Sequence, residues 1–340
     1  MKAIQLTRFG EPETLELLDL PTPEPGVGEV LLRVGASGIN FADTLMRRDR
    51  YAITPPLPSV LGNEVTGVVA ALGPGVDGID VGMRVAAPLF ATPCGFGGYA
   101  EYALVPADCL IALPDTVSFG EAAALMVQGL TALHLVRRVM PEGKVVLVNA
   151  AAGGVGSMLV QLARRAGAHI IAAAASSSEK LAFAHSLGAD IGVDYTQPNW
   201  IDTLTEALGG KGPDIIYESA GGAVTAASLQ VLAPLGQIVI YGALNIQQFD
   251  FGVPELLRLI FNNQSVTGFA FAPLLTPESL KADLGELFDL VGCGELKVTI
   301  GGRYRLDQVA EAHHLLESRG SMGKLLLVPH AETPAADPAP

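Results

Sequence analysis

The sequence predicts a two-domain α/β protein in which a strand-rich region precedes a doubly wound parallel sheet. Roughly the first 118 residues contain short β-type runs separated by glycine and proline clusters. From about residue 120, strand-length apolar runs alternate with helix-length segments, an order typical of a parallel sheet with helices on both faces. The 340 residues, 49% apolar and only 16% charged, are enough for two well-buried domains.

The strand-rich region contains three clear β-type runs, after which the pattern becomes helical. The expected strands are residues 29–33, 65–71 and 84–87. Residues 121–139 have helical spacing without proline, and Pro141 and Gly143 end that segment. We therefore expect the parallel sheet to begin after residue 143.

The alternating region begins with residues 145–149, a continuous apolar run of the kind found in buried parallel strands. Further strands are expected at 168–174 (or 170–175), 191–194, 214–218, 237–242 and 266–270, and helices at 155–166, 178–187, 200–208, 224–232 and 254–262. After residue 271 we expect helices at 277–290 and 306–318, a short β segment between them and a last strand at 324–328. Residues 331–340, rich in alanine, proline and acids, are predicted to be disordered.

Composition excludes several classes of partner. Thirty-five acidic residues against 21 Lys and Arg give a formal charge of −14, which argues against nucleic-acid binding. We find no apolar run of 18 residues and expect no membrane span, and the strand-like start does not resemble a secretory signal. The three cysteines lie too far apart for a disulfide framework or a Cys-x-x-Cys metal site, which favours a cytoplasmic location.

The strongest motif is a glycine-rich turn between the strand 145–149 and the following helix. Ala151-x-Gly153-x-x-Gly156 is the dinucleotide-binding pattern with alanine in first place. Gly153 would let the backbone approach a pyrophosphate, Gly156 would let helix and strand pack closely, and the helix start would offer amide donors. A tight turn that binds nothing is the alternative, but the flanking β-α units favour a cofactor.

The next strand indicates which dinucleotide binds. Enzymes that use NAD usually carry an acid at the end of this strand, for the ribose 2′-hydroxyl. Here Ala175 stands at that end, and Ser176 and Lys180 follow with a hydroxyl donor and a cation. Both groups suit a 2′-phosphate, so the sequence predicts NADPH. The alternative for Lys180 is a solvated lysine at the start of a helix.

Five ordered segments carry a resemblance to a known family. They are GINFAD at 38–43, LPSVLGNE at 57–64 followed by Gly67, QGLTA at 128–132, the turn segment 143–164, and ESR at 317–319 with GK at 323–324. Together they resemble the quinone oxidoreductases and zeta-crystallin of the medium-chain dehydrogenase/reductase superfamily. The resemblance extends over nearly the whole chain.

The resemblance implies a domain arrangement and a shared cleft. We expect a GroES-like partial β-barrel catalytic domain at 1–122 and a Rossmann NADPH-binding domain at 123–270. Residues 271–330 would return to the first domain, and 331–340 would form the disordered tail. The resemblance also implies a cleft between the domains and a homodimer formed through the strand near 265–270.

The zinc ligands of related dehydrogenases are replaced in this sequence. Those relatives place a cysteine where Asn40 stands and a histidine where Asn63 stands, and amides are poor zinc ligands. Apolar residues precede QGLTA where a third ligand is usual, and the four-cysteine lobe is missing. We therefore expect no metal. Glu64 remains, either as a buried structural carboxylate or in a catalytic role.

Without a Lewis acid, hydride must go to an acceptor that is already electrophilic, such as a quinone or an α,β-unsaturated carbonyl. The predicted catalytic residues are Asn40, Tyr51 and Asp43. Asn40 would donate a hydrogen bond to a carbonyl or the nicotinamide, and Tyr51 would donate a proton or shape the pocket. The predicted cofactor-binding residues are Asn40, Thr131, Ala152, Gly153, Gly154, Val155, Gly156, Ser176, Lys180, Tyr195, Gly242, Phe269, Arg319 and Lys324.

Three other functions stay open at this point. An enoyl-thioester reductase of the same superfamily would share Tyr51 and the segment at 62–64. In that case the basic cluster at 47–50 would contact an anionic substrate such as a CoA thioester rather than form a solvated loop. A zinc alcohol dehydrogenase and a non-enzymatic NADPH-binding protein are the remaining alternatives.

Overall fold

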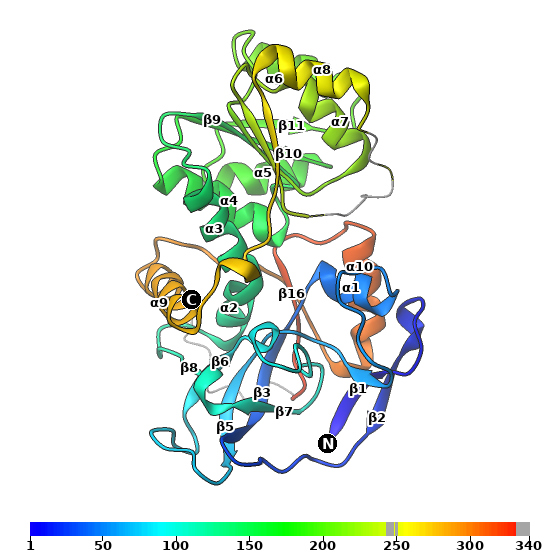
Figure 1. The fold of residues 1–340 in the computed structure, drawn as a ribbon, viewed down its shortest axis with the longest axis vertical. Coiled ribbons are helices and arrows are strands. Elements are labelled where there is room, and N and C mark those ends of the chain that lie inside the picture. Colours follow the sequence, from blue (N-terminus) through cyan, green and yellow to red (C-terminus); the bar gives the residue numbers. More distant parts are fainter. Residues whose placement is uncertain (243–247, 249–250, 331–340) are drawn as a thin grey trace. The chain divides into compact units, whose positions relative to one another are not determined.

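The computed structural model describes residues 1–242, 248 and 251–330, and the predicted tail at 331–340 lies outside them. The chain divides into two compact units (Figure 1). Unit 1 comprises Met1–Val127 together with the C-terminal residues from Leu275, and unit 2 comprises Gln128–Leu274. These boundaries lie a few residues later than the predicted ones at 122 and 270.

Unit 1 is built from two sheets. One has the order β2-β1-β4, and the other has the order β15-β16-β3-β5-β6-β8, with β7 also paired to β3. The strands are β1 Lys2–Leu6, β2 Leu15–Asp19, β3 Glu29–Ile39, β4 Ser59–Val60, β5 Val65–Leu72, β6 Arg84–Ala87, β7 Tyr102–Pro106, β8 Ile111–Ala112, β15 Ile300–Tyr304 and β16 Lys324–Leu327. The strand predicted at 29–33 therefore continues for six further residues, to Ile39.

The C-terminal segment belongs to unit 1 because β16 pairs antiparallel with β3, with Leu325 opposite Ile39. The α-helices of this unit are α1 Phe41–Arg47, α2 Phe119–Ala124, α9 Pro277–Gly292 and α10 Val309–Glu317, and its 3-10 turns are Pro12–Thr14, Leu89–Ala91, Ala107–Cys109 and Leu306–Gln308. α10 packs against α1. One hydrophobic cluster contains Ile4, Ile39 and Leu325, so both ends of the chain share a core.

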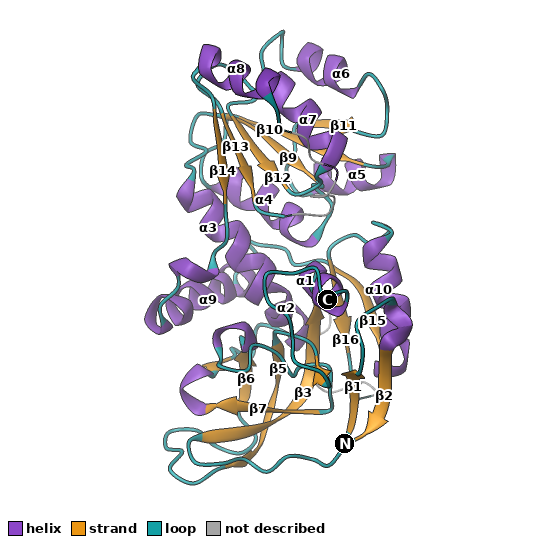
Figure 2. Ribbon diagram, turned by 45° about the vertical axis from the view of Figure 1, so that its right-hand side comes forward, coloured by secondary structure: helices purple, strands orange, loops and turns teal. Residues whose placement is uncertain are grey.

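Unit 2 is a parallel six-stranded sheet in the order β11-β10-β9-β12-β13-β14, with helices on both sides (Figure 2). The strands are β9 Val145–Asn149, β10 Ile170–Ala175, β11 Ile191–Asp194, β12 Ile215–Glu218, β13 Gln237–Ile240 and β14 Ser265–Gly268. The helices are α3 Leu130–Arg138, α4 Gly154–Arg165, α5 Ser178–Ser186, α6 Trp200–Ala207, α7 Gly222–Val231 and α8 Val253–Asn262, with a 3-10 turn at Ala272–Leu274. The strand order reverses between β9 and β12, which is where such sheets bind nucleotides. The predicted doubly wound Rossmann fold is confirmed.

The single helix predicted at 121–139 differs from the structure. It is interrupted by a π-helical turn at Leu125–Gly129, with α2 before it and α3 after it. By length and composition, the helical segment Phe119–Arg138 also qualifies as a membrane span, but 72% of its apolar window is buried inside the protein. That degree of burial is typical of a core helix of a globular protein.

Candidate cofactor cradle and buried polar centre

The glycine-rich turn lies at the carboxyl end of β9, beside the point where the strand order reverses. Ala150, directly after β9, has a left-handed φ of 51°, and Gly153 is the N-cap of α4. The left-handed residue thus turns the chain between the end of β9 and the first turn of α4. Unpaired helix-start amides and the helix dipole favour a phosphate at this position.

Two glycines of the turn have close neighbours on the side where a larger residue would carry its Cβ. A Cβ at Gly156 would lie 2.3 Å from Ala150 O and 2.8 Å from Ala151 Cα, which are backbone atoms that cannot move aside easily. A Cβ at Gly154 would lie 2.0 Å from Gln128 Oε1. That oxygen is buried and has no hydrogen-bond partner among the described residues. The closely packed glycines and the unused acceptor fit a dinucleotide at this turn.

The sequence gives no reason to single out Gln128, although Gln128 is the first residue of the QGLTA segment at 128–132. The steric relation to Gly154 depends on how α3 and α4 pack, and residue spacing does not specify that.

The end of β10 carries no acid, and a cation lies just beyond it. Ala175, the last residue of β10, is buried, and it pairs with Asp194 of β11. The Asp194 carboxylate accepts hydrogen bonds from Thr196 N and Thr196 Oγ1. The bond from the Thr196 hydroxyl lowers the pKa of Asp194 below its usual range. Ser177 caps α5 and accepts from Lys180 N at 3.3 Å, and Lys180 Nζ lies 3.4 Å from Ser176 Oγ. A cation and a hydroxyl at this position are groups that suit a 2′-phosphate.

The other cofactor candidates of unit 2 lie at strand or helix ends. Tyr195 N donates to Ala175 O at 3.0 Å, and Phe269 N donates to Ile240 O at 2.9 Å. Gly242 follows β13, and a Cβ there would lie 2.6 Å from Ser219 Cβ. Thr131 is buried at the start of α3. Ala152 and Val155 complete the turn segment.

A buried polar network that sequence reasoning missed connects β9 and β12 at the same end of the sheet. Asn149 Nδ2 donates to Glu218 and, at 2.8 Å, to Ser228 Oγ. Glu218 Oε1 accepts from Gly221 N at 2.7 Å and from Thr225 Oγ1 at 2.9 Å. These bonds fix the two strand ends that flank the switch point. Their only signal in the sequence is a polar residue at the end of each apolar strand.

Unit 1 contains a second buried polar centre, made from the residue after β3, the first residue of β16 and the segment before β5. Lys324 Nζ donates to Glu64 Oε1 and, at 2.7 Å, to Asn40 Oδ1. Asn40 Nδ2 donates to Glu64 Oε1 at 2.7 Å and to Asn63 Oδ1 at 2.9 Å. Val127 N donates to Glu64 Oε2 at 2.7 Å. All four side chains are buried, so the pair of charges is compensated inside the protein.

Asp43 lies next to this centre. Its Oδ2 accepts from Asn40 N at 2.7 Å and from Tyr99 OH at 3.1 Å, and Tyr99 OH lies 3.3 Å from His313 Nε2. Burial raises the pKa of Asp43 to about 7 and lowers the pKa of His313 to about 3. The Asp43 carboxylate closes the capping box of α1. These contacts support a structural role for Asp43 rather than a contact with substrate.

The structure gives Asn40 and Lys324 partners that the sequence did not suggest. Both N–H groups of the Asn40 amide are committed to Glu64 and Asn63, which leaves no donor for a carbonyl or the nicotinamide. The Lys324 ammonium is fully buried and bonded within unit 1, which argues against contact with the 2′-phosphate. Arg319, also in unit 1, follows α10 with a left-handed φ of 57°. Tyr51 follows α1 and is 43% exposed.

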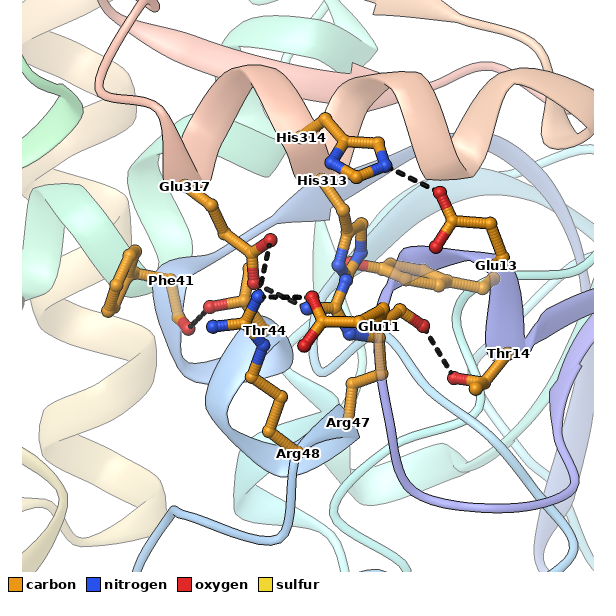
Figure 3. A network of polar contacts seen from close by, with 11 residues as sticks. Glu11, Glu13, Thr14, Phe41, Thr44, Arg47, Arg48, His313, His314 and Glu317 are labelled. Atoms are coloured by element: carbon orange, nitrogen blue, oxygen red, sulfur yellow. Dashed lines mark hydrogen bonds and ion pairs between the residues drawn. The ribbon is translucent and has the colours of Figure 1, made fainter.

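Two of the three arginines of the basic cluster at 47–50, Arg47 and Arg48, are paired with acids (Figure 3). Arg47 is fully buried and pairs with Glu317 of α10. Arg48 pairs with Glu11 at 2.6 Å and with Glu317 at 3.3 Å. The two arginines thus fasten α1 to α10 and the N-terminal segment, and offer little free charge to an anionic substrate.

Within the described ranges 1–242, 248 and 251–330, no group of three or more His, Cys, Asp or Glu side chains is placed to hold a metal ion. At the centre in unit 1, the positive charge beside Glu64 is the ammonium of Lys324, and two hydrogen-bonded amides surround it. An ammonium in contact with the carboxylate would repel a second cation, and amides are weak ligands for zinc.

Comparison with known proteins gives a consistent family. A model described as "Alcohol dehydrogenase GroES-like domain" matches residues 26–115, and one described as "Zinc-binding dehydrogenase" matches residues 154–289. A quinone oxidoreductase of Pseudomonas aeruginosa is 36% identical over 332 residues, covering 96% of this chain and 99% of the relative. A 2-haloacrylate reductase of Burkholderia sp is 34% identical over 346 residues, covering 97% and 99%. The solved structure of Escherichia coli quinone oxidoreductase complexed with NADPH has a TM-score of 0.87 and 32% identity, covering 97% and 100%.

Proposed function

This chain belongs to the quinone oxidoreductase family of the medium-chain dehydrogenases/reductases, and we propose that it transfers a hydride from NADPH to quinones or α,β-unsaturated carbonyls without zinc. The observation that carries the proposal is the buried Lys324–Glu64 pair with its two amides. Because this centre offers no Lewis acid, the acceptor must itself stabilise the charge that hydride addition creates. Quinones and conjugated carbonyls do so by delocalising the charge onto oxygen.

The residues of unit 2 fit the cofactor. When bound, NADPH supplies the hydride. The first amides of α4, with Gly153 and Gly154, would hold its pyrophosphate, and Ser176 and Lys180 would hold its 2′-phosphate. Ala152, Val155, Gly156, Thr131, Tyr195, Gly242 and Phe269 would shape the rest of the cofactor site.

Tyr51 of unit 1 is the proposed proton donor. Burial, followed by the charge of Asp43, raises its pKa, so the phenol stays protonated at neutral pH. Its partial exposure lets the lost proton be replaced from solvent. The 2-haloacrylate reductase among the relatives supports acceptors with a double bond conjugated to a carbonyl group.

We expect the purified protein to reduce 1,4-benzoquinone and a simple enone with NADPH at least about tenfold faster, in kcat/KM, than crotonyl-CoA. The reason is that Glu11 and Glu317 neutralise Arg47 and Arg48, two of the three arginines at 47–50 that a CoA phosphate would need. Steady-state NADPH oxidation at 340 nm measures all three substrates, with the heat-inactivated protein as control. A preference for crotonyl-CoA would instead favour the enoyl-thioester reductase.

We also propose a homodimer formed through β14 and α8. β14 is the edge strand of its sheet, and none of the residues of α8 is buried. Val253, Leu256, Leu257 and Ile260 recur at helical spacing, all exposed, and Phe261 beside them is 79% exposed. An unpaired edge strand next to an apolar helix face suits pairing with a second copy of the same chain.

Replacing Phe261 with glutamate should shift the protein from dimer to a 35.3 kDa monomer, because it puts a charge into the apolar face. Light scattering coupled to size-exclusion chromatography measures the mass. Val27→Glu is the matched control, since Val27 is 82% exposed but lies in a loop of unit 1. A wild-type protein that is monomeric at micromolar concentration would contradict the proposed dimer.

We propose a cytoplasmic location because the cysteine thiols are free. Cys94, Cys109 and Cys293 are all free, and Cys94 and Cys293 are exposed. Exposed free thiols persist in a reducing compartment.

A further inference from the structure

The orientation of two buried amides in unit 1 is determined by the charges beside them. An ammonium can only donate hydrogen bonds and a carboxylate can only accept them, whereas an asparagine amide does either, according to which way it is turned. Lys324 Nζ therefore requires an acceptor at 2.7 Å, which makes the Asn40 atom facing it Oδ1. Nδ2 of Asn40 must then face Glu64 Oε1, as it does at 2.7 Å.

The same reasoning extends one residue further. Asn40 Nδ2 has two hydrogens, and its second hydrogen bond goes to Asn63 at 2.9 Å. The atom of Asn63 that receives it must be an acceptor, so Oδ1 of Asn63 faces inward and Nδ2 faces the opposite way. The Lys324–Glu64 pair thus determines which way the Asn40 amide is turned, and through Asn40 it determines which way the Asn63 amide is turned.

This arrangement leaves one amide donor unused. Both N–H groups of the Asn40 amide already donate hydrogen bonds, whereas Asn63 Nδ2 makes no hydrogen bond to any residue the structure describes. Asn63 also keeps 8% of its surface exposed to solvent, whereas Glu64 and Lys324 are almost completely buried. A neutral donor held at the edge of a buried, fully bonded network is what a developing negative oxygen requires.

We propose that Asn63 Nδ2 donates the hydrogen bond to the substrate oxygen that gains charge, and that Lys324, Glu64 and Asn40 are positioning residues that keep it turned toward the substrate. The inference rests on the proposed function.

Hydride addition gives the acceptor two electrons and one proton, NADPH becomes NADP⁺, and the acceptor becomes a hydroquinone monoanion or an enolate. A second proton then neutralises that oxygen or carbon. Asn63 stabilises the anion until the proton arrives.

The first test removes the donor. Asn63→Ala should lower kcat for 1,4-benzoquinone by about 10²-fold, the usual effect of losing one oxyanion donor, and leave the Kd for NADPH unchanged. In Asn63→Asp the loss should be relieved as the pH falls through the pKa of the new carboxyl, because its protonated form again offers a donor. The charge of Glu64 favours that protonated form, whereas the Lys324 ammonium and the Asn40 N–H oppose it. Asn199→Asp, at an exposed position before α6, should show neither effect.

The second test inverts the amides without touching Asn63. In the double variant Glu64→Gln/Lys324→Met, the glutamine introduced at position 64 must accept the hydrogen bond from Val127 N, so its oxygen faces Val127. Its nitrogen then faces Asn40. Asn40 then turns its oxygen inward, and Asn63 must turn its nitrogen inward and its oxygen toward the substrate. We expect kcat to fall as far as in Asn63→Ala, with NADPH affinity intact.

Wild-type turnover in the same assay reports on the proposed function, and the variant-to-wild-type ratio reports on Asn63. Where turnover is absent, calorimetry of quinone binding should still show a several-fold loss of affinity in Asn63→Ala. Full kcat in a folded Asn63→Ala protein would overturn the inference. So would a weakened Kd for NADPH with kcat retained, because the amide would then serve the nicotinamide.

Discussion

Replacing Gly156 with alanine should abolish NADPH binding, with a Kd raised by more than about 100-fold. The added Cβ would sit 2.3 Å from Ala150 O and 2.8 Å from Ala151 Cα, so the turn must open or α4 must move away from β9. Either movement displaces the helix-start amides that the pyrophosphate needs. Overpacking of this kind also costs about 1–3 kcal/mol of stability. Fluorescence titration of NADPH and a thermal melt measure the two effects.

Gly285→Ala is the matched control for this substitution. Gly285 lies within α9, and a Cβ there meets nothing within 4 Å. Alanine is the better helix former by about 1 kcal/mol, so this variant should be slightly stabilised and bind NADPH normally. If Gly156→Ala bound NADPH as tightly as wild type, the turn would not be the pyrophosphate site.

Reversing the charge of Lys180 should weaken NADPH by about 10- to 100-fold and leave NADH unaffected. Lys180 Nζ stands 3.4 Å from Ser176 Oγ, just beyond the end of β10, and no carboxylate ends that strand. A hydrogen bond to a charged group is worth about 1.5–3 kcal/mol, and Lys180→Glu replaces it with repulsion of the 2′-phosphate. Kd values for both cofactors, measured by the same titration, separate a charge effect from a general loss of binding.

Lys211→Glu provides the control for net charge, because Lys211 lies exposed in the loop before β12. It should change neither Kd. An equal loss of NADPH and NADH affinity in Lys180→Glu would mean that the lysine supports α5 rather than the phosphate.

The strands and helices of unit 2 were the most predictable part of the molecule. The bounds of β9 and β11 coincide with the predicted ranges 145–149 and 191–194. Parallel strands buried on both faces give continuous apolar runs, and turns with strict glycine requirements separate them from the helices. The π-helical turn at Leu125–Gly129 was not predictable, since its residues are apolar and helix-compatible throughout.

The candidate site was only partly predictable, because residue identity does not reveal partners. The sequence suggested Asn40 as a donor and Lys324 as a phosphate contact. In the structure these two side chains bond to each other and to Glu64, across 284 and 260 positions of chain. The arginines at 47 and 48 likewise have partners on α10 that no local pattern marks.

The sequence by itself determined the two-domain α/β fold, the glycine turn and the absence of an acid at the end of β10, since each depends on local periodicity or on one residue type at one position. The tertiary structure alone decided which polar groups in unit 1 are already used. That depends on β16 pairing with β3, which brings Lys324 beside Glu64 and Asn40. The ammonium of Lys324 and the carboxylate of Glu64 fix which way the Asn40 amide is turned, and the Asn40 amide in turn fixes that of Asn63.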